Sequence, residues 1–94
     1  MYFEDNDYFI NEEEVPKCEK MFSKNFPGFN IVHSRFTTFS FSNQECYVVI
    51  GEKDGEKVKV FFVLDYYEDE GMVELIMLDT TMDEIDSEEI HYVG

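Results

Sequence analysis

The chain has 94 residues, of which 22 are acidic and seven are basic, so its formal net charge at pH 7 is −15. Contacts with phosphate need Lys and Arg, so this balance argues against direct binding to nucleic acid or to an anionic membrane. Apolar residues make up 44% of the chain, enough for one small hydrophobic core. We therefore expect a single domain over residues 1–94.

Residues 1–11 mix acidic and aromatic side chains and predict an N-terminal arm with no regular secondary structure. Its apolar residues would be costly to leave in water, so docking on the core and a frayed terminus both stay open. The segment lacks the basic region and apolar stretch of a signal peptide, and no part of the chain is apolar for long enough to span a membrane. We expect a cytoplasmic protein in which Cys18 and Cys46 are reduced thiols.

A helix is predicted over residues 12–26. Asn11 can cap its start, and the three glutamates that follow suit the positive end of a helix dipole. Proline is tolerated in the first turn and little further, so the regular helix should begin near Val15 or Pro16. Apolar residues then recur at spacings of three and four, which predicts one buried stripe formed by Cys18, Met21, Phe22 and Phe26.

From residue 30 the apolar period changes to two, which predicts an antiparallel sheet over residues 30–80. The first strand is long, and a bend or bulge near Ser34-Arg35 would switch its inward face. The pair Asp54-Gly55 supplies the positive φ angles that a tight hairpin turn needs. The region has room for about four strands joined as a meander.

The central hairpin of this sheet follows the Asp-Gly turn. Alternate residues from Val58 to Tyr66 are apolar without exception and should face the core. Phe61 and Val63 make the opposite face apolar in the middle, so we expect the chain termini to cover part of that face. The predicted fold is thus α+β, with an N-terminal helix packed on an antiparallel meander. Its order of elements is similar to that of double-stranded-RNA-binding domains, but the charge has the wrong sign for that function.

The acidic C-terminal segment, residues 81–92, allows two interpretations. Thr81 and Glu84 have the spacing of a capping box, which predicts a short second helix with Met82 and Ile85 facing inward. The alternation that ends the chain, from residue 90 to residue 93, favours a terminal strand instead.

No motif for catalysis or for a cofactor stands out. Neither Asp5-Asn6-Asp7 nor residues 65–71 match a calcium-binding EF-hand loop, so at most loose association with Ca²⁺ or Mg²⁺ is expected. Zinc would need four separated residues to converge: Cys18, His33, Cys46 and His91. Cys46 with either histidine is a formal nucleophile–base pair without further support. We therefore expect no enzymatic activity, no cofactor and no metal.

The charge pattern is the remaining functional signal. No Lys or Arg follows Lys59, whereas eleven acidic residues do. Carboxylates with interspersed tyrosines can contact Lys and Arg through ion pairs and cation–π contacts together, as a nucleic acid does through phosphates and bases. The predicted partner-binding residues are Asp65, Tyr67, Glu68, Asp69, Glu70, Glu74, Asp79, Asp83, Glu84, Asp86, Glu88 and Glu89.

In size, charge and α+β character, the chain resembles the small acidic proteins with which phages and mobile elements inhibit host nucleases, including anti-CRISPR and anti-restriction proteins. The resemblance includes no specific motif. It implies a viral inhibitor that imitates DNA or RNA, acting in the host cytoplasm on the basic surface of a nucleic-acid-binding enzyme. Two alternatives stay open: an immunity or antitoxin-type protein that neutralises a basic toxin, and an acidic domain that forms a homodimer through its second sheet face.

Overall fold

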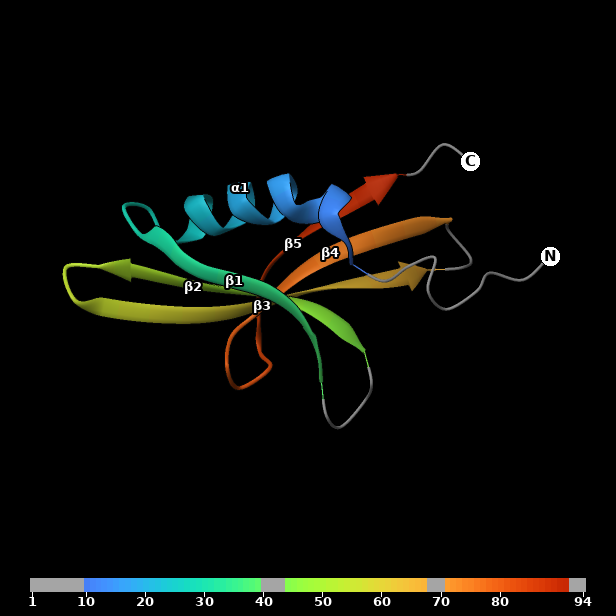
Figure 1. Ribbon diagram of the computed structural model, residues 1–94. Helices are drawn as coiled ribbons and strands as arrows, with labels where there is room; N and C mark the ends of the chain where they lie inside the picture. Colours follow the sequence, from blue (N-terminus) through green and yellow to red (C-terminus); the bar gives the residue numbers. More distant parts are fainter. Residues whose placement is uncertain (1–9, 40–43, 68–70, 92–94) are drawn as a thin grey trace.

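The structure is a computed structural model that describes residues 10–39, 44–67 and 71–91 (Figure 1). A 3₁₀ turn, η2 (Glu12–Glu14), leads into one helix, α1 (Val15–Asn25). Five strands follow: β1 (Asn30–Thr38), β2 (Glu45–Lys53), β3 (Glu56–Tyr67), β4 (Met72–Leu78) and β5 (Glu84–His91). They form one antiparallel sheet in the order β1-β2-β3-β4-β5, with α1 lying over one face. The predicted α+β meander is confirmed, with five strands where about four were expected.

The start of the helix is built as its sequence predicts. The Asn11 side chain accepts a hydrogen bond from the Glu13 backbone N–H at 2.8 Å, and Glu14 Oε1 accepts one from the Asn11 N–H at 3.2 Å. These reciprocal bonds satisfy backbone donors that a helix start leaves unpaired. The first turn is 3₁₀, and the regular helix begins at Val15 with Pro16 in its first turn. It ends at Asn25, one residue before the predicted end.

The main core lies between α1 and the sheet. Cys18 and Phe22 of the helix are fully buried there, and Met21 nearly so. The predicted core parity of β3, from Val58 to Tyr66, contributes to this cluster along its whole length. Burying a side chain of this size stabilises a fold by roughly 1.5–3 kcal/mol relative to exposure. The helix stripe and the β3 parity therefore together explain how so acidic a chain folds.

The sheet face turned away from the helix is partly covered, and the cover that the structure describes comes from loops, whereas the termini were expected there. Cys46, Val48 and Val63 are buried on it. Two loops contribute the cover: Phe39, which follows β1, packs edge-on against Phe61 at 5.4 Å between ring centroids, and Met82 packs on the same cluster from the β4–β5 loop. The alternation of these strands thus produces two apolar clusters on opposite faces of one sheet.

The register of the sheet corrects one detail of the prediction. The bulge of β1 falls between Ile31 and His33, where Val32 has no partner in β2, and not near Ser34-Arg35. The β2–β3 hairpin turns at Asp54 and Gly55, with φ angles of 52° and 85°, as the Asp-Gly pair predicts.

The predicted C-terminal helix is wrong. Met82 has a φ of 68°, which a right-handed helix cannot contain. The Thr81 hydroxyl donates to Asp79 Oδ1 at 2.6 Å and to Asp83 Oδ2 at 3.0 Å, so it holds a loop together and caps no helix. Residues 84–91 instead pair with β4 along its length and satisfy their backbone groups in the sheet. Met82 and Ile85 do pack inward, but on different clusters.

Most of the predicted N-terminal arm falls in residues 1–9, outside the described part of the chain. At its end, Ile10 is 2% exposed and belongs to the main core. Among the described residues, no helix is long and apolar enough to cross a membrane.

Candidate functional site: an acidic row across strands β3, β4 and β5

The sheet order separates the charges of the chain in space. All seven Lys and Arg residues lie on α1 or on the β1–β2–β3 side of the sheet: Lys17, Lys20, Lys24, Arg35, Lys53, Lys57 and Lys59. Strands β4 and β5 and the loop between them contain only acidic charges: Glu74, Asp79, Asp83, Glu84, Asp86, Glu88 and Glu89. Within the sheet, the basic residues therefore lie on β1, β2 and β3, apart from the acidic strand β5 at the opposite edge, whereas the three lysines of α1 lie beside β5.

Three carboxylates form a row across adjacent strands. Asp65 of β3 lies directly opposite Glu74 of β4, and Glu74 lies directly opposite Glu89 of β5. All three alternate with core residues of the helix-facing cluster, so they share the sheet face turned away from α1. Neighbouring strands are about 4.8 Å apart, so the row places three like charges within about 10 Å. Directly opposed like charges destabilise a sheet, and folding alone would favour another residue at Glu74.

An exposed tyrosine adjoins this acidic row (Asp65, Glu74 and Glu89). The Tyr67 side chain is 37% exposed, and its hydroxyl donates a hydrogen bond to Glu74 Oε1 at 2.8 Å. That hydrogen bond and the nearby Asp65 carboxylate raise the pKa of Tyr67 to about 12. The hydroxyl thus stays protonated and holds Glu74 in place, while the ring offers an apolar surface beside the carboxylates.

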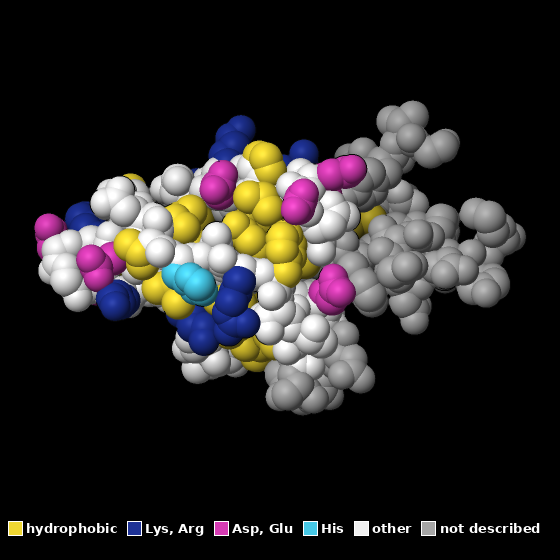
Figure 2. All heavy atoms as spheres, viewed as in Figure 1, with side chains coloured by type: hydrophobic (Ala, Val, Ile, Leu, Met, Phe, Trp, Pro, Cys, Tyr) yellow, Lys and Arg dark blue, Asp and Glu magenta, His cyan; other side chains and the backbone are white. Residues whose placement is uncertain are grey.

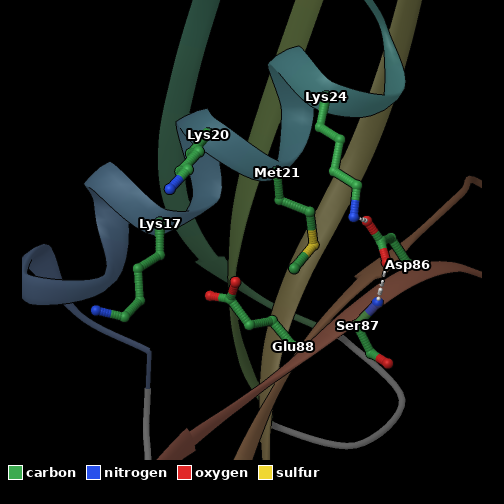
Figure 3. A pocket seen from close by; sticks show the side chains of 7 residues that line it. All are labelled: Lys17, Lys20, Met21, Lys24, Asp86, Ser87 and Glu88. Carbon is green, nitrogen blue, oxygen red and sulfur yellow. Dashed lines mark hydrogen bonds and ion pairs between the residues drawn. The ribbon is translucent and has the colours of Figure 1, made fainter.

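Asp86 and Glu88, two other predicted site residues, lie on the opposite, helix-facing side of β5. They line a groove of about 230 Å³ between α1 and β5, together with the lysines of the helix (Figure 3). Asp86 Oδ2 accepts a hydrogen bond from Asn25 Nδ2 at 2.8 Å and forms an ion pair with Lys24 Nζ at 3.6 Å. The charge of Asp86 is therefore used within the molecule, where it ties the end of α1 to β5.

Asp79 and Asp83 are likewise engaged inside the β4–β5 loop. Asp79 Oδ1 accepts hydrogen bonds from the backbone N–H groups of Thr81 at 2.8 Å and Asp83 at 3.0 Å. Such a side chain organises a turn around itself. Glu84 is exposed where β5 begins, opposite Leu78. Glu68, Asp69 and Glu70 lie outside the described residues.

The two internally bonded aspartates predict a loss of stability in acid. The Asn25 hydrogen bond lowers the pKa of Asp86 below its usual 3.8, and the Thr81 hydroxyl does the same for Asp79. A depressed pKa in the folded state contributes stability above the unfolded-state pKa and loses it as the pH falls through the folded-state value. The protein should therefore lose this contribution below about pH 3.8.

Denaturant unfolding at pH 7 and at about pH 3 tests this expectation, with Asp79→Asn/Asp86→Asn as the comparison. The variant should be less stable than the wild type at pH 7, and the difference should shrink in acid. Protonation of the remaining carboxylates relieves repulsion in both proteins, so only their difference is informative. A difference that does not change with pH would contradict the role given to the two aspartates.

The two cysteines considered as nucleophile or zinc ligands lie on opposite faces of the sheet. Cys18 and Cys46 are both buried. Burial and the nearby Glu14 raise the pKa of Cys18 to about 12, and burial also raises the pKa of Cys46. Within residues 10–39, 44–67 and 71–91, no group of three or more His, Cys, Asp or Glu side chains is placed to hold a metal ion.

Sequence reasoning missed two arrangements. The first is the contact of the α1 lysines with β5. It can be predicted only once the C-terminal segment is known to be a strand. The row of carboxylates could be found halfway: Asp65 and Glu74 are equidistant from the centre of the predicted hairpin turn, which places them opposite each other. Glu89 completes the row only once β5 is paired with β4.

Comparison of the chain with protein-family models, with curated proteins and with solved structures found no match.

Proposed function

We propose that this protein is a small acidic inhibitor that binds the basic nucleic-acid-binding surface of a partner enzyme, as a phage-type mimic of DNA or RNA. The observation that carries the proposal is the acidic row with its adjacent tyrosine. Three carboxylates in register on neighbouring strands oppose folding, whereas they suit a surface rich in Lys and Arg. Inhibition needs no catalytic group, and the site of action is the cytoplasm, that of the host if the protein comes from a phage.

The spacing of the acidic row supports mimicry. Its carboxylates recur at about 4.8 Å from strand to strand, which makes a dense line of negative charge, as the phosphates of a nucleic-acid strand do. Tyr67 adds an exposed ring on which an Arg side chain can stack, a contact worth about 0.5–1 kcal/mol where exposed. The row and the ring together present negative charge beside an aromatic plane, which are the two features that a basic groove recognises in a nucleic acid.

Not every predicted site residue belongs to this surface. The row, Tyr67 and Glu84 are the described residues that we assign to partner contact. Glu68, Asp69 and Glu70 lie outside the described residues and stay predicted contacts from the sequence. Asp79 and Asp86 we assign to holding the fold, because the carboxylate of Asp79 organises the β4–β5 loop and that of Asp86 ties the end of α1 to β5. Asp83 accepts a hydrogen bond within the β4–β5 loop, and Glu88 lies beside the lysines of α1. We therefore leave both residues out of the partner surface.

The experiment is capture of partners by the immobilised protein from cells that express CRISPR or restriction nucleases, at about 0.15 M and at about 1 M salt. Because the contacts are electrostatic, the enzyme should be retained at the lower salt and released at the higher. A partner that stays bound at the higher salt would contradict the mechanism. The immunity-type alternative predicts a different result. A toxin bound at a surface other than its nucleic-acid site would not be displaced by DNA or RNA.

A further inference from the structure

The two edges of the sheet differ sharply in charge. Strand β5, at one edge, contains four acidic residues among its eight: Glu84, Asp86, Glu88 and Glu89. Strand β1, at the other edge, has nine residues without a single carboxylate. Charged side chains on an edge strand are a common protection against pairing with other chains. Strand β5 therefore has such protection against strand addition, whereas β1 has only Arg35 and the bulge at Val32.

Strand β1 also exposes apolar side chains. Among the described residues, three large hydrophobic side chains are exposed, and two of them are on β1: Val32 at 54% and Phe36 at 40%. Figure 2, viewed from the side on which β1 lies nearest, shows hydrophobic side chains gathered in the centre of this face beside a histidine and basic side chains. Within the part of the chain that the structure describes, no strand pairs with the outer side of β1, so its backbone N–H and C=O groups on that side form an open edge.

We propose that β1 pairs with β1 of a second copy, which makes an antiparallel dimer with a continuous ten-stranded sheet. A two-fold axis at Ser34 sets Val32 of one copy opposite Phe36 of the second copy, and the same contact recurs across the axis. Each exposed hydrophobic side chain thereby gains an apolar neighbour directly across the new strand pair.

Charge favours a second copy at this edge over any other described part of the molecule. Two chains that each have a net charge of −15 repel each other. Strand β1 contains no carboxylate, so no acidic side chains of β1 are opposed across the new strand pair. The two β5 strands end up nine strand spacings apart, or about 43 Å, which is several Debye lengths at physiological salt. The acidic row stays accessible on both copies, so the dimer is compatible with partner binding and independent of it.

The molecular mass in solution tests the dimer through sedimentation of the purified protein at high micromolar concentration. The wild type should sediment as a dimer, and Phe36→Lys should be monomeric because two lysines are brought against Val32 of the opposite copy. Ser23→Lys adds the same charge to an exposed position of α1 and should leave the dimer intact. Circular dichroism checks that each variant is folded.

A cross-link tests the register. Ser34→Cys places one exposed thiol in the described part of the chain, since both native cysteines are buried. Opposed residues of antiparallel strands have Cα atoms about 4.5–5.5 Å apart, within the range of a disulfide, so mild oxidation should yield a covalent dimer. Ser23→Cys should not cross-link. A wild-type monomer, a dimer that survives Phe36→Lys, or equal cross-linking of both cysteine variants would overturn the proposal.

Discussion

Replacing Gly51 with alanine should destabilise the protein by about 2–3 kcal/mol, near the upper end for one overpacked core position. A Cβ atom there would lie 2.4 Å from Cζ and 2.9 Å from Cε2 of Phe22, distances at which something must move. Neither side has room to give, because Phe22 is fully buried between α1 and the sheet. For a domain of this size, such a loss lowers the melting temperature by roughly 10–20 °C.

A double-mutant cycle identifies the cause. Phe22→Leu removes the two ring atoms that the new methyl group would meet, at the cost of a small cavity when made alone. If the clash is the mechanism, Gly51→Ala/Phe22→Leu should be more stable than the sum of the single effects predicts, by about 0.5–3 kcal/mol. Thermal or urea unfolding measures all four proteins. Simple additivity would show that Gly51 is needed for another reason.

The second large effect concerns the acidic row. Asp65→Lys/Glu89→Lys leaves Glu74 flanked by two lysines, so two like-charge pairs become two opposite-charge pairs. The sheet should become more stable by about 0.2–1 kcal/mol per pair, because opposed unlike charges stabilise adjacent strands. Affinity for the enzyme retained in the capture experiment should fall about 100-fold or more, since close charge pairs at an interface contribute roughly 1.5 kcal/mol or more each.

The matched control changes the net charge by the same amount elsewhere. Glu19→Lys/Glu56→Lys alters exposed positions on α1 and at the start of β3, away from the acidic row. It should weaken binding only through the long-range field, an effect that salt screens. An equal loss of affinity in the two double variants, measured by titration calorimetry, would mean that total charge is recognised and that the row is no binding site.

The helix and the central hairpin could be predicted from the sequence because their signals are local. Asn11, the three glutamates and Pro16 specify a helix start without reference to the rest of the chain. Asp54-Gly55 specifies its turn in the same way, and the uninterrupted apolar parity of β3 leaves one choice for the core face. In each case a few adjacent residues determine the backbone, and tertiary contacts agree with them.

For the C-terminal segment, the local signals could not decide between a helix and a strand. The spacing of Thr81 and Glu84 suits a helix start, but Asp79 binds the Thr81 hydroxyl and turns the chain into a loop. The backbone of residues 84–91 then pairs with β4, a neighbour that the local pattern does not reveal. The acidic row could not be predicted for the same reason, because a helix over these residues would have directed Glu89 away from Glu74.

The charge asymmetry itself was evident from the sequence. Which acidic residues hold the fold together and which lie on the proposed partner surface was not evident. Asp79 and Asp86 look no different from Asp65 in the sequence, yet their carboxylates are bonded within the fold. That distinction depends on Thr81 and Asn25, whose side chains reach them only in the folded chain. Acidic residues count toward a partner surface only after those used by the fold itself have been set aside.

We propose that the acidic row occupies the surface where a partner enzyme holds nucleic acid. The most direct measurement is displacement of that enzyme, captured on the immobilised protein, by increasing concentrations of duplex DNA or of RNA. We expect one of the two nucleic acids to release the enzyme, at concentrations set by the affinity of that nucleic acid for the enzyme. The immobilised Asp65→Lys/Glu89→Lys variant should capture no enzyme. An enzyme that remains bound at saturating concentrations of both DNA and RNA would contradict the claim.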